Sequence, residues 1–159
     1  MKIVYIAETS LTNKSAYSQH VIKMCDAFAQ LNHDIILYLP KFNTDTKYDE
    51  IKKKFLLVAK KRILIKSLTN LKNTNSFFKL FFLIKVIYFI KKDNPELILT
   101  RSFISSIILS IFKIHHYLEI HSEFQSITKL LMLKLNYINS KYIIKKIIIS
   151  EALNKILKF

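Results

Sequence analysis

Short apolar runs alternate with stretches of helical periodicity along this chain, and the first forty residues show the pattern most clearly. Lys2–Ala7 is a run rich in Ile and Val, which is typical of a strand buried on both faces. After a polar segment, apolar residues recur every three or four positions and predict a helix that begins near Tyr17. The residues on its apolar face are Val21, Met24, Cys25, Phe28 and Leu31. Asp34–Leu39 then has the pattern of a second buried strand.

Two polar residues mark the ends of this first helix. Ser15 is placed to cap it, because a serine hydroxyl can accept a hydrogen bond from a free backbone N–H of the first turn. Asn32 follows the last turn, where a left-handed residue is favoured and asparagine can substitute for glycine. Strand, helix and strand form a right-handed βαβ unit, and ligands of such sheets bind beyond the carboxyl ends of the strands. The loop Glu8–Ser15 lies at that end.

Apolar runs and helical periodicities continue to alternate through the rest of the chain. Four further strands are predicted, at Arg62–Leu68, Leu97–Thr100, His116–His121 and Lys145–Ile149. Helices are predicted at Tyr48–Ala59 (although Phe55–Val58 fits a strand equally well), Phe77–Lys91, Phe103–Phe112, Phe124–Ile138 and from Glu151 onward. The serines expected on the surface of the helix at Phe103–Phe112 are Ser105, Ser106 and Ser110. This alternation indicates an α/β fold, a three-layer sandwich around a mainly parallel sheet of about six strands.

Composition narrows the class of protein and leaves one question open. With 159 residues, 51% of them hydrophobic, the chain is long enough for one domain with a sizeable core. The net charge of +15 favours an anionic partner, such as a nucleic acid, an acidic lipid or a phosphorylated substrate. Nearly all of the basic residues are lysines, and the two arginines are Arg62 and Arg101. The chain also contains no glycine. Drift in the base composition of the gene is therefore the competing explanation.

Several classes of protein are excluded at this stage. A chain without glycine has no glycine-rich phosphate loop, which excludes P-loop kinases and standard dinucleotide binders. Cys25 has no second cysteine to pair with and is expected to be a buried thiol in a reducing compartment. No signal peptide is visible, and the best candidate for a membrane span, Phe77–Ile90, is too short and contains Lys79 and Lys85. We therefore expect a cytoplasmic protein, with peripheral attachment to the inner face of the membrane as an option.

The candidate catalytic residues follow two of the predicted strands. Side chains alternate along a strand, so Glu119 and His121 are expected to point the same way at the carboxyl end of their strand. A carboxylate beside an imidazole can raise the histidine pKa and fix its orientation, although an ordinary strand-end histidine is the plainer alternative. Arg101 ends another strand, where a fixed guanidinium suits phosphate or carboxylate binding. The alternative for Arg101 is a surface ion pair.

The loop before the first helix is a second candidate site. A helix N-terminus attracts anions through its free N–H groups and its dipole. The candidate residues of this loop and of the first two helical turns are Glu8, Thr9, Ser10, Ser15, Tyr17 and His20. His20 is placed either to face the cleft or simply to be solvated. His115 and His116 point to opposite faces of their strand, so no metal site is expected.

Two stretches of this sequence resemble one enzyme family. Ala16, Ser18 and His20 fit a small-x-Ser-x-His pattern, which is followed by a helix and a short turn that ends at His33. Later matches are Thr100-Arg101-Ser102 and Leu118-Glu119-Ile120-His121-Ser122. In this order, the stretches resemble the family 4 glycosyltransferases, which have the two-domain GT-B fold. The resemblance covers nearly the whole chain, and only the first half of such an enzyme.

The resemblance implies that residues 1–150 form the Rossmann-like, acceptor-side half of a GT-B glycosyltransferase, and that 151–159 begin the helix between its domains. The family binds the nucleotide-sugar on the second domain through two glutamates eight positions apart, and no two glutamates here have that spacing. The chain is therefore expected to need a donor-binding domain or chain as partner, to use no cofactor, and to accept a glycan or a lipid-linked acceptor. His121 would approach the transferred sugar or stabilise the departing phosphate.

A binding protein is the alternative function. Phe77–Lys92 and Phe124–Lys134 mix lysine with aromatic or long aliphatic residues, which fits either helices packed on the sheet or attachment to an anionic membrane. Against a membrane helix, we expect the lysines at 79, 85, 91 and 92 not to share one helical face. A basic α/β module could equally dock on a partner chain. No nucleic-acid-binding motif is present, so a nucleic acid is not the expected partner.

Overall fold

A computed structural model describes residues 1–12, 14–40, 48–67, 76–124 and 126–151 of this chain. They belong to two compact units, an N-terminal unit of Met1–Leu97 and a C-terminal unit of Ile98–Phe159. Beyond Glu151, the predicted last helix lies outside the described residues. None of the described helices is both long enough and apolar enough to cross a lipid bilayer.

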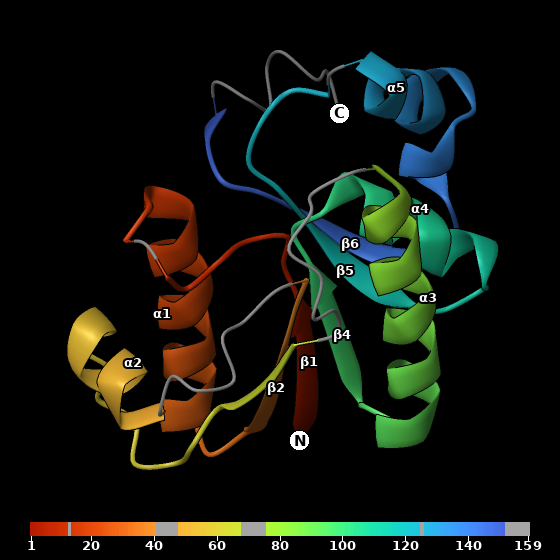
Figure 1. Cartoon of the computed structure of the whole chain (residues 1–159). Helices are drawn as coiled ribbons and strands as arrows, with labels where there is room; N and C mark the ends of the chain where they lie inside the picture. The colour runs from red at the N-terminus through yellow and green to blue at the C-terminus, as the bar shows by residue number, and fades with distance from the viewer. Residues whose placement is uncertain (13, 41–47, 68–75, 125, 152–159) are drawn as a thin grey trace. The chain divides into compact units, whose positions relative to one another are not determined.

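The N-terminal unit is built from three parallel strands with helices on both faces. Its elements are β1 (Lys2–Ile6), α1 (Ala16–Gln30), β2 (Asp34–Leu39), α2 (Tyr48–Phe55), β3 (Leu64–Ser67) and α3 (Ser76–Asp93). β2 pairs with β1 and with β3, in registers that align Ile3 with Ile35 and Ile36 with Leu64. α1 and α2 lie on one face of these strands and α3 lies on the other (Figure 1). Because both faces are covered, β1 and β2 are buried along almost their whole length, as their apolar runs predict.

The C-terminal unit contributes three more parallel strands. Its elements are β4 (Leu97–Thr100), α4 (Phe103–Ile111), β5 (His116–Ile120), α5 (Ser126–Lys129), a π-helical turn (Leu130–Lys134), a 3₁₀ turn (Tyr137–Asn139) and β6 (Ile143–Ile148). One cluster of buried core residues in this unit consists of Ile107, Leu118, Ile120, Phe124, Met132 and Ile138. The sheet has six strands in the order β3-β2-β1-β4-β5-β6. The predicted α/β, Rossmann-like fold with a parallel sheet is thereby confirmed.

Both predicted ends of α1 are confirmed, and of its predicted apolar face Val21 and Cys25 are buried while Met24 and Phe28 are half-buried. The hydroxyl of Ser15 accepts from the backbone N–H of Ser18 at 3.1 Å, and Asn32 is left-handed with φ 63°. Leu31, however, is exposed, because it is the C-cap residue of α1 rather than part of its last helical turn. Ala29 is buried instead.

Other elements also have bounds that differ from those predicted. α2 ends at Phe55 because Leu56 has a left-handed backbone with φ 52°, and neither a longer helix nor a strand follows there. β6 begins two residues before its predicted start. The helix predicted at Phe124–Ile138 ends in a π-helical turn at Lys134, and a separate 3₁₀ turn follows because Asn136 is left-handed with φ 58°. The apolar periodicity of this segment therefore predicted that some of its residues are buried, such as Met132 and Ile138, and did not predict that the helix is interrupted.

The serines of α4 are a clearer error. Ser105, Ser106 and Ser110 were expected on the surface of this helix, and the structure buries all three. α4 is short and apolar on most of its circumference, so its serines lie within the packed face rather than outside it. One of them, Ser106, has a partner on β5, which is described below.

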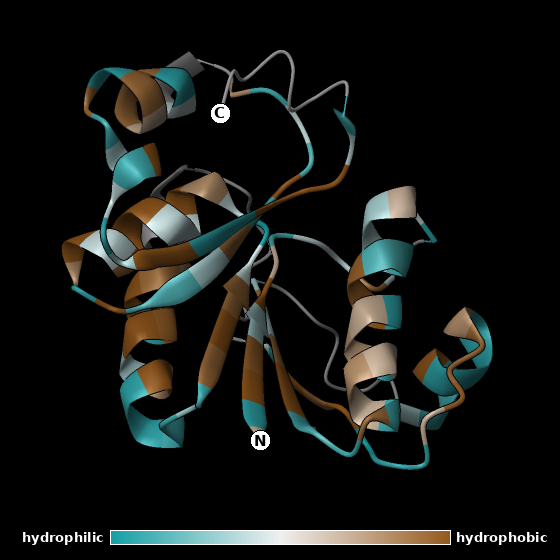
Figure 2. Ribbon diagram, turned by 180° about the vertical axis from the view of Figure 1, so that it is seen from behind, coloured by the Kyte–Doolittle hydropathy of each residue, from teal (hydrophilic) through white to brown (hydrophobic). Residues whose placement is uncertain are grey.

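α3 is apolar almost all round (Figure 2), and its two sides have different surroundings. Packing on the sheet is confirmed for one side, whose buried residues are Phe82, Leu83, Val86, Ile87 and Ile90. The other side, which is not covered, carries Phe81, Ile84, Lys85, Tyr88, Lys91 and Lys92. Lys85, Lys91 and Lys92 lie on this side, and the side chain of Lys79 lies outside the described part, so the expectation that the four lysines do not share one face stays a prediction.

Candidate functional site

The candidate site of the C-terminal unit is centred on a buried ion pair at the ends of β4 and β5. The register of these strands aligns Leu99 with Tyr117 and Thr100 with Leu118, so that Arg101 follows next to Glu119. Nη1 of Arg101 lies 3.4 Å from Oε1 of Glu119. Their side chains are only 8% and 3% exposed. The alternative of a surface ion pair for Arg101 is therefore wrong.

The backbone on either side of Arg101 is fixed by its two neighbours. Oγ1 of Thr100 accepts from the N–H of Ser102 at 3.2 Å. The hydroxyl of Ser102 in turn caps α4 by accepting from the N–H of Ser105 at 3.0 Å. The sequence Thr-Arg-Ser is thus a compact turn from a strand into a helix. The turn fixes the backbone of Arg101 and the ion pair with Glu119 orients its guanidinium, a group suited to recognition of a phosphate or a carboxylate.

His121 follows β5 directly and contacts an aromatic residue that was not predicted. Its ring stacks on Phe103, with 5.9 Å between the ring centroids and 14° between the planes. Phe103 in turn meets the buried Phe124 edge-to-face, at 4.7 Å between centroids. Glu119 thus contacts Arg101 and His121 contacts Phe103, while the expected pairing of Glu119 with His121 stays a prediction. Phe103 is the first residue of α4 after its capping serine, at the carboxyl end of β4, and this place in the sequence could have marked it as a residue near the site.

Hydrogen bonds link the described residues of the loop between β1 and α1 in the N-terminal unit. The Ser10 and Thr12 hydroxyls lie 2.8 Å apart, and Ser10 also accepts from the N–H of Thr12 at 3.2 Å. Lys54 on α2 donates to the carbonyl of Leu11 at 3.1 Å and to that of Thr12. The side chain of Leu11 is buried beneath this loop. Sequence patterns gave no sign of the lysine, because it lies more than forty positions away in the chain.

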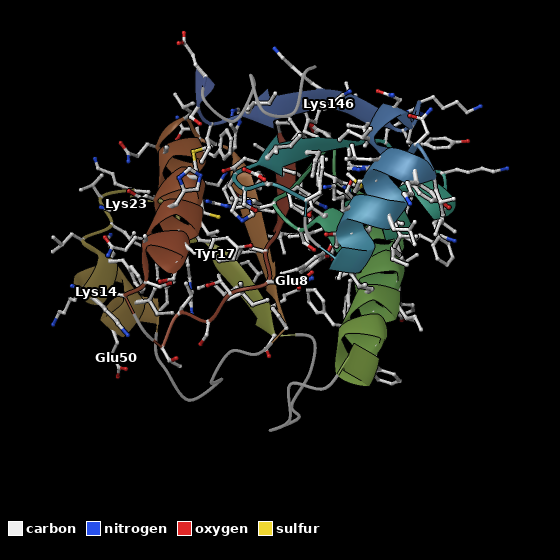
Figure 3. The ribbon with its side chains drawn as sticks, turned by 90° about the horizontal axis from the view of Figure 1, so that it is seen from above. Glu8, Lys14, Tyr17, Lys23, Glu50 and Lys146 are labelled. Carbon is white, nitrogen blue, oxygen red and sulfur yellow. The ribbon has the colours of Figure 1, made fainter. Side chains whose placement is uncertain are left out.

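The predicted residues of this loop differ in their surroundings. Glu8, Thr9, Tyr17 and His20 are half-buried, while Ser10 and Ser15 are exposed. Full solvation of His20, one of the two alternatives considered for it, is thereby wrong. Glu8 lies nearer the strands, whereas Lys14, Lys23 and Glu50 lie on the α1 and α2 side (Figure 3). The candidate residues thus divide between the units, the loop set in the N-terminal one and Arg101, Glu119 and His121 in the other.

A second polar pair of the C-terminal unit lies in its core. Nδ1 of His116 lies 2.9 Å from the carbonyl of Ile114 and must donate to it, so Nε2 accepts from the Ser106 hydroxyl at 2.7 Å. Burial lowers the pKa of His116, which keeps the ring neutral. Both side chains are fully buried, so this pair joins α4 to β5 and is closed to a substrate. His115 is exposed, as the opposite orientation of the two histidines predicts.

Asp26 on α1 is the most important polar residue that the sequence analysis missed. Its buried carboxylate accepts from the N–H groups of Val58 and Ala59 at 3.1 and 3.0 Å. These donors lie just beyond α2, so Asp26 fixes the segment between α2 and β3. The neighbouring Cys25 is buried, as predicted, and burial raises its thiol pKa far above the ordinary value. Cys25 is therefore an inert thiol.

Asp93, at the end of α3, is the centre of a third polar group. Its carboxylate accepts from Tyr38 on β2 and from Lys66 on β3, the latter at 2.5 Å. Burial raises the pKa of Asp93, but hydrogen bonds from Lys66 and Tyr38 outweigh it, so that the pKa is lowered. This group attaches α3 to two strands at once. In the described part of the chain, no three histidine, cysteine, aspartate or glutamate residues lie where they could hold a metal ion.

The sequence matches no protein-family model and no curated protein. Among solved structures, the chain is similar to UDP-N-acetylglucosamine 2-epimerase from Rickettsia bellii, with a TM-score of 0.57 and 16% sequence identity. This chain has a GT-B-type fold. The similarity covers 99% of the chain and 41% of the epimerase, so the chain corresponds to less than half of that enzyme. At this identity the likeness extends to the fold alone.

Proposed function

We propose that this chain forms the acceptor-side domain of a glycosyltransferase, which transfers a sugar from a nucleotide-sugar to a glycan or lipid-linked acceptor. The observation that carries the proposal is the buried pair of Arg101 and Glu119, at the carboxyl ends of adjacent strands in a GT-B-type fold. Open α/β sheets bind their ligands at that edge. The matches to family 4 sequences include both residues of the pair.

A buried ion pair has a cost that argues for a role. Removing two charges from water costs several kcal/mol per ion, so a pair of apolar residues often stabilises a fold equally well or better. A pair retained at a ligand-binding edge is thus a candidate for function. In the proposed reaction the Glu119 carboxylate holds the Arg101 guanidinium, which binds a phosphate group of the substrate or of the departing nucleoside diphosphate. His121, oriented by Phe103, approaches the transferred sugar.

The donor site belongs to another domain in this proposal. Because the chain corresponds to 41% of the similar enzyme, a complete reaction needs a donor-binding domain in the same or a separate chain. The nucleotide-sugar is a substrate, and no cofactor is required. The loop residues Glu8, Thr9, Ser10, Ser15, Tyr17 and His20 of the N-terminal unit stay candidates for acceptor or phosphate binding in this proposal. The reaction would take place in the cytoplasm, where nucleotide-sugars are available.

Sugar-nucleotide epimerisation is the second candidate, because the similar solved structure is an enzyme of that name. The two reactions give different products. A transferase breaks the bond between sugar and phosphate, forms a glycosidic bond to the acceptor and releases the nucleoside diphosphate. An epimerase instead inverts one carbon of the sugar and gives an isomer of the same mass.

The test is a product assay with the chain and a donor-binding GT-B domain. UDP-N-acetylglucosamine and other UDP-sugars are supplied with and without a glycolipid extract, and the products are analysed by mass spectrometry. We expect UDP release that depends on the extract, together with a lipid product heavier by one sugar. Arg101→Gln should lower that rate by about 100-fold or more, as for loss of a transition-state contact, while the exposed-lysine variant Lys53→Gln should not.

Two results would oppose the proposal. An isomer of unchanged mass, formed without acceptor, would favour the epimerase. Tight binding of a UDP-sugar to this chain alone, measured by calorimetry, would contradict the assignment of the donor to another domain.

A further inference from the structure

The uncovered side of α3 combines large apolar residues with lysines and carries no exposed acid. Phe81, Ile84 and Tyr88 are 50%, 55% and 63% exposed. Lys91 and Lys92 are exposed beside them, and Lys85 is half-buried. At about 100° per residue, these six positions lie within about 120° of the helix circumference. They form one continuous face, which we call the α3 face.

The charges of the α3 face have one sign. Asp93 is the single acidic residue of α3, and its side chain is only 14% exposed because it is turned toward Tyr38 and Lys66. Lys85 lies over the ring of Phe81, with 5.4 Å from Nζ to the ring centroid. The hydrophilic residues are concentrated in the last turn of this helix, as the colours of Figure 2 show. The face therefore combines apolar residues with Lys85 near its middle and with Lys91 and Lys92 in the last turn.

We infer that the α3 face docks on an anionic lipid surface. Phenylalanine and tyrosine insert at the boundary between lipid headgroups and acyl chains, where a ring can be buried while a hydroxyl stays in water. Lysines on the same face reach the phosphates through their long aliphatic stems. The net charge of +15 adds long-range attraction to the same kind of surface. The inference stands independently of the proposed glycosyl transfer, because it uses none of the residues of that site.

A lipid surface fits this face better than a second protein does. A large contiguous apolar patch on the surface of a soluble protein commonly marks an interaction site. In an antiparallel pair of copies, Lys85 near the middle of the face would lie close to Lys85 of its twin, and like charges would repel. An acidic bilayer satisfies the apolar and the basic parts of the face at once.

Vesicle co-sedimentation tests the inference. The chain is mixed with vesicles of phosphatidylcholine alone, or of phosphatidylcholine with one third phosphatidylglycerol. We expect binding to the mixed vesicles to be at least about tenfold tighter, and to weaken with salt. Equal binding to both kinds of vesicle, or to neither, would overturn the inference.

Two pairs of substitutions separate the α3 face from the overall charge. Each lysine near an acidic leaflet raises binding by about fivefold, so Lys91→Glu with Lys92→Glu should lower affinity by about 25-fold or more. Lys53→Glu with Lys60→Glu is the matched control, because it changes the net charge equally at exposed lysines away from α3. We expect less than about a threefold effect from the control pair. An equal loss in both pairs would overturn the inference, since overall charge alone would then explain binding.

The apolar part of the face has its own test. Phe81→Ser with Tyr88→Ser should lower vesicle binding by about tenfold or more, and circular dichroism should show an intact fold, since both side chains are half-exposed or more. If this variant instead abolished a dimer seen by size-exclusion chromatography and left vesicle binding unchanged, the α3 face would be an interface between copies of the chain. That result would overturn the inference.

Discussion

The two units of the chain differ in how their best-buried polar side chains are used. In the N-terminal unit the buried Asp26 accepts from two backbone N–H groups and Lys23 donates to the carbonyl of Leu56 at 2.6 Å, although Asp93 also binds the side chains of Tyr38 and Lys66. In the C-terminal unit two buried side-chain pairs join neighbouring elements, Arg101 with Glu119 and Ser106 with His116. A backbone contact needs only one residue of the right length, whereas a side-chain pair needs two. The pairs are therefore more informative about function.

Some of the many lysines also have a structural role. Lysines that donate to backbone carbonyls are Lys2, Lys23, Lys52, Lys54 and Lys61. Several of these carbonyls lie at or just beyond the end of a helix, where they have no helical partner and where a cation is favoured. Drift toward lysine and selection for these contacts are compatible, because a lysine that arises by drift can acquire a structural contact.

The largest expected effect is on the buried pair. Glu119→Ala should lower the free energy of unfolding by about 3–5 kcal/mol, because the Arg101 guanidinium loses its buried counter-charge. Urea denaturation measures it. The double variant Arg101→Met with Glu119→Leu should recover most of the loss, since two apolar side chains have no charge to desolvate. Equal losses in the single and double variants would show that the pair does not act as a unit. Glu123→Ala, at an exposed glutamate, is the control, and a large loss there would show that the effect is not specific to the buried pair.

The corresponding residue of the N-terminal unit is Asp26. Asp26→Ala should lower the free energy of unfolding by about 2–3 kcal/mol, because the N–H groups of Val58 and Ala59 are left without their carboxylate. Hydrogen exchange should show faster exchange at these two amides. The control is Gln30→Ala, which removes a side-chain donor to Asp26 and leaves both backbone bonds intact. If the control destabilised as much, the backbone contacts would not be the cause.

The Ser106–His116 pair should make stability depend on pH. Burial lowers the folded-state pKa of His116 below its ordinary value of 6.5, so the unfolded chain binds the proton more readily. Stability is therefore fully present above the ordinary pKa and is lost as pH falls through it toward the folded-state value. The slope from this residue should be at most about 1.4 kcal/mol per pH unit. His116→Gln should flatten the dependence in urea titrations at several pH values, and His115→Gln at the exposed neighbour should not.

The smallest effect is expected from a lysine that binds the loop between β1 and α1. Lys54→Met should lower the free energy of unfolding by about 1 kcal/mol, because it keeps the aliphatic stem and loses the bonds to the carbonyls of Leu11 and Thr12. Hydrogen exchange in this loop should rise. The matched variant Lys53→Met changes an exposed lysine one position away and should leave both quantities unchanged. Equal effects at the two positions would show that the hydrogen bonds of Lys54 do not stabilise the loop.

The sequence by itself determined the fold of this protein and the places where its chain changes direction. The apolar runs of β1 and β2 have a pattern that suits only strands covered on both faces. Ser15 and Asn32 fix the two ends of α1 through local backbone chemistry, which involves few neighbours. Such features can be predicted from the sequence because the residues that cause them lie close together along the chain.

The tertiary structure alone decided which polar residues meet. The partner of Arg101 depends on the register between β4 and β5, and Ser106 meets His116 only because α4 packs on β5. Asp26 and Lys54 bind groups more than thirty positions away. The outer side of α3 looked like its inner side in sequence, since both are apolar, and only packing decided which side stays uncovered. Contacts between distant segments depend on how layers pack, and no local pattern of residues encodes that arrangement.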